Sequence, residues 1–96
     1  MNFSQALEEL KLGKKVARKG WGKGAFIYLV ESKVVNIENL QGEAAKHFEA
    51  HKDSNRGKRV TISSHIDMKT ADGSLLVGWT PSEDDMLADD WEIIFK

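Results

Sequence analysis

The residues best suited to binding chemistry lie in one glycine-rich segment, Gly20-Trp21-Gly22-Lys23-Gly24. Glycines at three of five positions disfavour regular structure and let backbone N–H groups approach a ligand closely. The indole of Trp21 offers a plane for a purine base, while Arg18, Lys19 and Lys23 supply positive charge for phosphate. The spacing is neither that of a P-loop nor that of G-x-G-x-x-G before a helix. A tight turn whose Trp21 fills the core explains the same residues equally well, and the sequence leaves both interpretations open.

A second group of candidate residues lies near the end of the chain. Trp79 is followed by Thr80 and Pro81, and this segment is predicted to form the rim of a pocket. The acidic residues that follow Ser82 fit the N-terminal turn of a short helix better than a calcium loop, which alternates its oxygen ligands around a glycine. Trp91 precedes Ile-Ile-Phe and is predicted to pack in the core.

The sequence predicts no metal site, no cofactor and no catalytic set. His47 and His51 have the spacing of a zinc-binding helix, but that motif places Glu directly after the first histidine, where this chain has Phe48. His65 lies on a predicted strand with no evident link to the other two. The glycines of a nucleophile elbow are missing, and a pair of catalytic carboxylates normally needs a deep cleft that a small chain rarely builds. We therefore expect a protein that is not an enzyme.

Length and composition narrow the class further. The 96 residues fit one domain, residues 1–96, and a net charge of −1 argues against nonspecific binding to DNA or RNA. The chain has no cysteine, so it has no disulfide framework, thiolate zinc site or cysteine nucleophile. No apolar run approaches the ~20 residues of a membrane span, and the N-terminus lacks a signal core. These features predict a cytoplasmic protein with no membrane partner.

The hydrophobic pattern predicts an α+β fold, mainly a small antiparallel sheet with short helices. The first helix is expected between an N-cap at Ser4 and Gly13, and a hairpin is expected to join residues 25–30 to 34–37. Residues 43–58, a weak helix followed by a polar loop, are predicted to be a mobile insertion. A helix capped by Ser82 and Asp85 is expected before the last strand. The remaining strands are predicted at residues 15–19, 60–68, 75–79 and 91–95.

Two stretches of the sequence resemble a small domain of phages and prophages that was long described as a domain of unknown function. In the first half the matching residues are Met1-Asn-Phe-Ser-Gln-Ala-Leu7 and Lys14-Lys-Val-Ala-Arg-Lys-Gly-Trp21. In the second half they are His65-Ile-Asp-Met-Lys-Thr-Ala-Asp-Gly73, Gly78-Trp79 and Asp85-Met-Leu-Ala-Asp-Asp-Trp91. The resemblance covers residues 1–37 and 60–96 and is weaker in the middle. Members of this family include Thoeris anti-defence proteins of the second type.

The resemblance implies a function as well as a fold. Such proteins act as sponges: they bind and sequester cyclic ADP-ribose isomers, such as glycocyclic ADP-ribose made by bacterial TIR-domain enzymes, without cleaving them. Some relatives also sequester cyclic oligonucleotide signals of CBASS defence. Members of the family are small β-rich homotetramers with ligand pockets between subunits, so self-association in the cytoplasm of the host bacterium is implied here. The residues that would contact the ligand are Arg18, Trp21, Gly22, Lys23, Gly24, Phe26, Trp79, Thr80, Ser82, Asp85 and Met86.

Other functions remain open at this point. The chain could be a phage protein-interaction or structural module with no nucleotide ligand, or a small hydrolase of the same signals that uses the carboxylates between Asp84 and Asp90. For the phosphates of a bound nucleotide, Arg18 or Lys23 is the predicted partner. The alternative is that backbone N–H groups and the hydroxyls of residues 80–82 bind them.

Overall fold

The structure, a computed structural model, describes residues 1–95 and confirms the α+β fold with a small antiparallel sheet. The chain divides into two compact units. Unit 1 contains Met1–Val30 together with the C-terminal segment from His65, and unit 2 contains Glu31–Ser64. The prediction of one domain, residues 1–96, stays a prediction, as does the mobility of residues 43–58.

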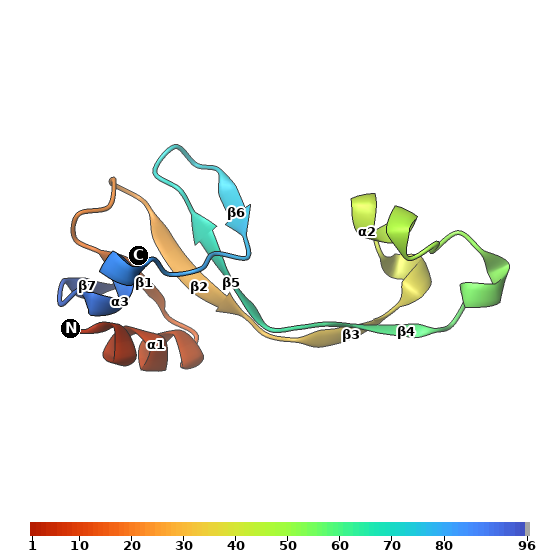
Figure 1. The fold of residues 1–96 in the computed structure, drawn as a ribbon, viewed down its shortest axis with the longest axis horizontal. Helices are drawn as coiled ribbons and strands as arrows, with labels where there is room; N and C mark the ends of the chain where they lie inside the picture. The colour runs from red at the N-terminus through yellow and green to blue at the C-terminus, as the bar shows by residue number, and fades with distance from the viewer. Residues whose placement is uncertain (96) are drawn as a thin grey trace. The chain divides into compact units, whose positions relative to one another are not determined.

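Unit 1 is a five-stranded antiparallel sheet with two helices (Figure 1). The strand order is β6-β5-β2-β1-β7, and helix α1 packs against β1, β7 and β2. None of the helices within residues 1–95 is long and apolar enough to cross a membrane. The elements of unit 1 are α1 (Phe3–Lys11), β1 (Lys15–Arg18), β2 (Phe26–Val30), β5 (His65–Lys69), β6 (Leu75–Val77), α3 (Glu83–Leu87) and β7 (Trp91–Ile94).

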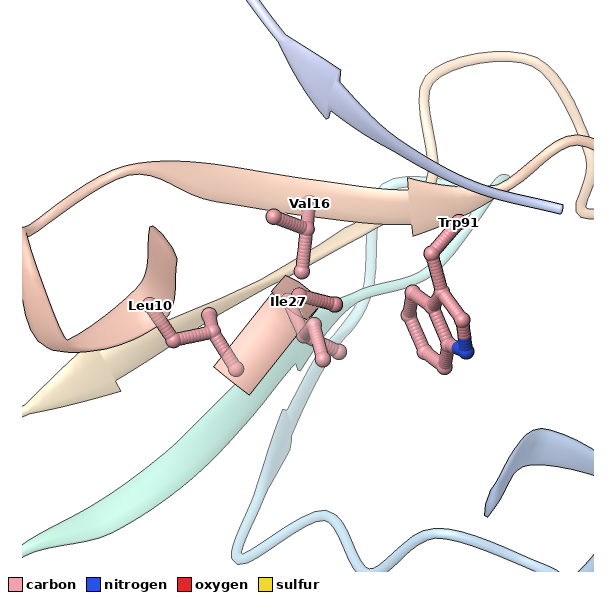
Figure 2. Packing of buried hydrophobic residues seen from close by; sticks show 5 residues of the cluster. Leu10, Val16, Ile27 and Trp91 are labelled. Carbon is pink, nitrogen blue, oxygen red and sulfur yellow. The ribbon is translucent and has the colours of Figure 1, made fainter. Parts of the chain in front are cut away.

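The core of unit 1 lies between α1 and one face of the sheet. Figure 2 shows Leu10 of α1, Val16 of β1, Ile27 of β2 and Trp91 of β7 converging there, and all four side chains are almost completely buried. Alternation along β2 places Ile27 on the core face and its neighbours Phe26 and Tyr28 on the opposite face. The predicted core position of Trp91 is confirmed.

The helix caps explain where both helices of unit 1 begin. The prediction of Ser4 as the first N-cap is wrong: the cap is Asn2, whose side chain accepts from the backbone N–H of Gln5 while the Gln5 side chain accepts from Asn2. This reciprocal capping box satisfies two donors, whereas a start at Ser4 would leave them unpaired. The cap of α3 is the predicted one, with Ser82 and Asp85 bonded reciprocally.

Unit 2 is a two-stranded ribbon, β3 (Lys33–Asn36) paired with β4 (Arg59–Ile62), followed outward by short helical turns. Ile37 is its buried hydrophobic residue, and the Ile37 N–H donates to the carbonyl of Lys58. The carboxylate of Glu38 accepts from Gly57 N–H, which closes the same end of the ribbon. The helical turns are η1 (Ile37–Asn39), α2 (Gly42–His47) and η2 (Asp53–Asn55).

The structure overturns two predictions about strands. Residues 25–30 and 34–37 do not form a hairpin: β2 pairs with β1 and β5, whereas β3 pairs with β4. The single strand predicted at residues 60–68 is two strands, because β4 ends at Ile62 and β5 begins at His65. Both pairings follow one register, in which Val30 lies opposite His65 and Lys33 opposite Ile62. Alternation of apolar residues continues through such a break, so the sequence alone could not reveal it.

Candidate functional site

The glycine-rich loop between β1 and β2 folds as two consecutive turns. Trp21 N–H donates to the carbonyl of Arg18, and Ala25 N–H donates to the carbonyl of Gly22. Gly24 has φ of 88°, a left-handed conformation that favours glycine. The loop packs closely on the turn after β5, since a Cβ atom on Gly22 would lie 2.6 Å from the Cβ of Ala71. Gly22 and Gly24 are therefore required by the fold, whether or not a ligand approaches them.

Three tryptophans from separate segments pack edge to face. Trp21 lies in the glycine-rich loop, Trp79 follows β6, and Trp91 begins β7. The ring centroid of Trp21 lies 5.2 Å from that of Trp91 and 5.9 Å from that of Trp79. Trp91 is buried, and its indole N–H donates to the carbonyl of Asp85 at 2.9 Å. Trp21 and Trp79 are only partly buried. Trp21 thus packs on the core as the turn interpretation expects and still keeps part of its ring at the surface.

Arg18 links β1 to α3 and to the segment before β7. Its Nε donates to Asp90 at 3.0 Å, and one terminal nitrogen donates to Asp85 at 3.1 Å. The hydrogen bonds to Asp90 and then Asp85 raise the pKa of Arg18 above its ordinary value. The guanidinium is therefore committed to two carboxylates within its own chain, and its predicted role as a ligand for phosphate stays a prediction.

Asp85 is a structural carboxylate with both oxygens in use. One oxygen accepts from Arg18 and the other from Ser82 N–H at 2.9 Å. Burial raises the pKa of Asp85, but the hydrogen bonds from Ser82 and Arg18 outweigh it, so the pKa lies below the ordinary value. A carboxylate that is held ionised in this way is a poor general acid.

The segment that leads into Trp79 is anchored by a second buried carboxylate. Asp67 of β5, only 6% exposed, accepts from Gly78 N–H at 3.1 Å and lies 3.4 Å from Nε2 of His65. Trp79 N–H donates to the carbonyl of Ile66. The position of Trp79 is therefore set by β5, the strand that pairs with β6 in the hairpin predicted around the Asp-Gly turn at residues 72–73.

Phe26 belongs to a different surface from Trp21 and Trp79. It lies on the face of the sheet opposite the core, with the ammonium of Lys15 4.7 Å and that of Lys69 5.7 Å from its ring centroid. Lys69 also donates to the carbonyl of Gly24 at 3.2 Å. The sequence analysis did not single out Lys69. Lys69 lies beside the loop because β5 pairs with β2 in the register that places it opposite Phe26.

The remaining predicted ligand contacts are exposed side chains and backbone at the rim. Gly22, Lys23 and Gly24 are exposed on the loop. Thr80 and Ser82 are exposed before α3, and Met86 is half exposed on it. The structure thus brings Trp21 together with Trp79, and it links Arg18 to Asp85 and Asp85 to Ser82 by hydrogen bonds, whereas Phe26 stands apart.

Residues 1–95 close off no pocket of their own. Over the same residues, no group of three histidine or carboxylate side chains is placed to hold a metal ion. What this surface offers is therefore aromatic rings, hydroxyls, backbone N–H groups and ammonium groups. These are groups that stack on planar ligands and bind anions.

The fold and this surface define a small antiparallel α+β domain with a candidate binding surface made of tryptophan rings and polar groups. The chain belongs to the Thoeris anti-defense 2-like domain family, whose model matches residues 1–94. It is 35% identical over 95 residues to the protein named Thoeris anti-defense 2 of Bacillus phage SP01, an alignment that covers 98% of this chain and 94% of the relative. The resemblance identified from the sequence motifs is confirmed, and it extends through the middle segment as well.

Proposed function

We propose that this chain is a phage anti-defence protein that binds the cyclic nucleotide signal of Thoeris defence and sequesters it without cleavage. Membership of the Thoeris anti-defense 2-like family supports the part of the proposal that says the protein acts against Thoeris defence. The observation that carries the binding mechanism is the partly exposed pair of Trp21 and Trp79 beside a loop of accessible backbone N–H groups. The ligand class would be cyclic ADP-ribose isomers such as glycocyclic ADP-ribose, with CBASS cyclic oligonucleotides as a second class.

The chemistry of such a ligand matches the groups at this surface. A purine base would stack on the exposed part of Trp21 or Trp79, a contact worth about 1–3 kcal/mol. The pyrophosphate would bind to Lys23 and to the backbone N–H groups of the glycine-rich loop, because the Arg18 guanidinium already has two carboxylate partners. The hydroxyls of Thr80 and Ser82 would serve the ribose groups.

Sequestration fits the carboxylates better than hydrolysis does. The hydrolase alternative needs a carboxylate between Asp84 and Asp90 that can exchange a proton near neutral pH. Asp85 has both oxygens occupied, and Asp90 is paired with Arg18. A pocket shared between copies, in a homotetramer, would supply the enclosure that residues 1–95 of one chain do not form. The protein would act in the cytoplasm of the infected bacterium, with neither nucleic acid nor membrane as a partner.

The decisive experiment tests retention of intact ligand. The protein is incubated with a panel of cyclic ADP-ribose isomers, free ligand is removed, and the protein is then denatured by heat and the released nucleotide identified by chromatography. Recovery of the unchanged nucleotide supports a sponge. Cleaved products would instead support the hydrolase, and an empty protein would contradict nucleotide binding altogether.

A matched pair of variants tests the assignment of the phosphate site. Lys23→Ala should weaken binding about 10- to 150-fold, because it removes a charge-assisted hydrogen bond worth ~1.5–3 kcal/mol. Lys33→Ala removes an ammonium of a residue that is also exposed, in unit 2, and should bind like the parent. Titrations at two salt concentrations should show a weaker salt dependence for Lys23→Ala alone. Equal affinity and equal salt dependence in the two variants would contradict the assignment.

A protein-interaction module without a nucleotide ligand is the alternative, and the exposed apolar residues of β6 favour it. A thermal-shift screen separates the two functions. A ligand present at 100 times its Kd should stabilise the folded protein by ~2.7 kcal/mol. If no nucleotide in the panel raises the melting temperature, the interaction module becomes the better description.

A further inference from the structure

The segment that leads from β6 to Trp79 contains one residue more than the strand beside it. The pairing of β5 with β6 ends with Asp67 opposite Val77. Continued by one residue, the same register would place Gly78 opposite Ile66. However, it is the N–H of Trp79 that donates to the carbonyl of Ile66, at 2.6 Å. Gly78 is therefore an extra residue, and the chain forms a β-bulge at this point.

The conformation of Gly78 fits this bulge. Its φ is 80°, in the left-handed region, and a common type of bulge has a left-handed glycine as its first residue. A Cβ atom at this position would meet nothing within 4 Å, so the backbone conformation alone favours glycine. Bulges are frequent next to functional sites because they re-aim a side chain. The side chain that follows Gly78 is that of Trp79.

The bulge determines the face of the sheet on which Trp79 lies. Val77 and Asp67 share the face away from the core, since directly opposite residues share a face. In an unbroken strand, Trp79 would lie on this face too, because it follows Val77 by two residues. Opposite Ile66 it lies on the core face instead, and its ring centroid is 5.9 Å from that of Trp21. The bulge thus brings the two partly exposed rings of the candidate site together.

The carboxylate of Asp67 binds the N–H that the bulge takes out of the sheet. Its Oδ1 accepts from the N–H of Gly78 at 3.1 Å, and Asp67 is only 6% exposed. The same oxygen lies 3.4 Å from Nε2 of His65. A buried N–H without a partner destabilises a fold, and a carboxylate is a stronger acceptor than a neutral group. Asp67 therefore stabilises the bulge at the place where the ladder cannot.

We propose that Asp67 and Gly78 are positioning residues for ligand binding. Gly78 supplies the bulge, Asp67 satisfies its N–H, and the indole of Trp79 is turned towards Trp21 as a result. A purine base stacks on this side of Trp79 only while the bulge is in place. The part of the proposal that concerns binding rests on the proposed function, whereas the orientation of Trp79 does not.

The orientation of Trp79 can be measured without a ligand. Neighbouring indoles couple their transitions and give paired bands of opposite sign in far-ultraviolet circular dichroism, and Trp79→Phe defines the share of these bands that Trp79 contributes. Asp67→Leu has no acceptor for the N–H of Gly78 and should lose that share, whereas Asp67→Asn keeps an acceptor oxygen and should retain it. Glu92→Leu is the matched control, because Glu92 lies on the same face of the sheet and its side chain makes no hydrogen bond or ion pair within residues 1–95.

Deletion of Gly78 tests whether Asp67 acts through the bulge. The deletion removes the extra residue together with its N–H, and Trp79 stays opposite Ile66 in a regular ladder. In this background, Asp67→Leu should leave the paired bands unchanged. A carboxylate that served only packing or charge would matter equally with and without Gly78. If Asp67→Leu alone does not fold, the double variant decides: a folded protein with the bands supports the proposal, and an unfolded one overturns it.

Titration with glycocyclic ADP-ribose measures the consequence for binding. Loss of one stack between a base and an aromatic ring weakens binding about 5- to 150-fold, so Asp67→Leu should fall in this range and Asp67→Asn should bind like the parent. A folded Asp67→Leu variant that keeps the Trp79 bands, or that loses them and binds like the parent, would overturn the proposal. A parent protein that binds no nucleotide would contradict the proposed function, while the bands would still decide the orientation of Trp79.

Discussion

At the scale of single residues, Trp21 has a structural role that limits how its ligand role can be tested. Its ring contacts Trp79 and Trp91 edge to face, so it joins the loop to the core as well as reaching the surface. Arg18 is similar, because its guanidinium bonds to Asp85 and Asp90 and thereby holds α3 against β1. Substituting either residue is therefore expected to change the stability of the fold, whatever its effect on ligand affinity.

Trp21→Ala is expected to lower the free energy of unfolding by about 1–3 kcal/mol, because it removes two edge-to-face contacts of ~0.5–1.5 kcal/mol each. Trp21→Phe keeps an aromatic ring at both contacts and should lose less. Urea denaturation of the parent and both variants measures this. If the alanine variant is as stable as the parent, the indole does not support the core, and any loss of binding can be ascribed to stacking alone.

At the scale of elements, the loop and turn that flank the tryptophans position each other. Gly22 lies against Ala71 of the turn after β5, and Lys69 donates to the carbonyl of Gly24. The turn itself is held by Asp72, which accepts from Thr70 and Ser74. Helix α3 is positioned in the same way, by its capping box and by Arg18.

Gly22→Ala should destabilise the protein by ~1–3 kcal/mol, the usual cost of forcing a methyl group into a closely packed site. Gly20→Ala is the matched control in the same loop, because a Cβ there meets nothing within 4 Å and its φ is not in the left-handed region. Thermal unfolding of the two variants side by side checks the prediction. Equal melting temperatures would mean that the loop and the turn do not pack as the structure has them.

The pH dependence of stability should report the Asp85 cluster. The folded-state pKa of Asp85 is lowered, so its contribution is present above the unfolded-state pKa of ~3.9 and is lost as pH falls through the folded-state value. Thr70 and Ser74 lower the pKa of Asp72 to about 2, which adds a second loss over the same acid range. Asp85→Asn should therefore flatten the decline of stability below about pH 4.

Asp84→Asn is the control for that measurement, because Asp84 is exposed and its side chain makes no hydrogen bond or ion pair within residues 1–95. Chemical denaturation between pH 2 and 6 should give the same slope for Asp84→Asn and the parent. The account of Asp85 fails if Asp85→Asn keeps the parent slope as well.

At the scale of the whole molecule, the division into two units separates the candidate surface from the ribbon. Every predicted ligand residue lies in unit 1, and the core of α1 and the sheet lies there too. Unit 2 has one buried hydrophobic residue, Ile37, and exposes Val34 and Phe48. These facts make unit 1 the part of the chain expected to carry ligand binding.

Replacing residues 31–64 by Asn-Gly should leave unit 1 folded. Val30 and His65 are directly opposite in the β2–β5 pair, so a two-residue turn of the kind that Asn-Gly favours can join them as a hairpin. Near-ultraviolet circular dichroism of the tryptophans and a cooperative thermal transition would confirm the fold. Loss of the transition would show instead that unit 2 is needed for the stability of unit 1.

Local sequence signals determined much of this protein. The glycines of residues 20–24 disfavour regular structure, the Asp-Gly turn at residues 72–73 and the Ser82 cap follow from backbone chemistry within a few residues, and Trp91 followed by Ile-Ile-Phe indicates a core strand. The family motifs are likewise local runs of residues, and they identified the family correctly. These inferences succeed because each depends on residues that are neighbours in the chain.

Only the tertiary structure decided which distant segments meet. The partners of β2 and β3, the two carboxylates on Arg18, and Lys69 beside the glycine-rich loop all depend on strand register, which no local pattern specifies. The same is true of Trp21. The residues around it are compatible with a side chain in the core and with one that stacks on a ligand, and its contacts with Trp79 and Trp91 join three separate segments of the chain. Burial of apolar surface stabilises any arrangement that covers these rings. The arrangement is therefore determined by the whole sheet and not by the loop alone.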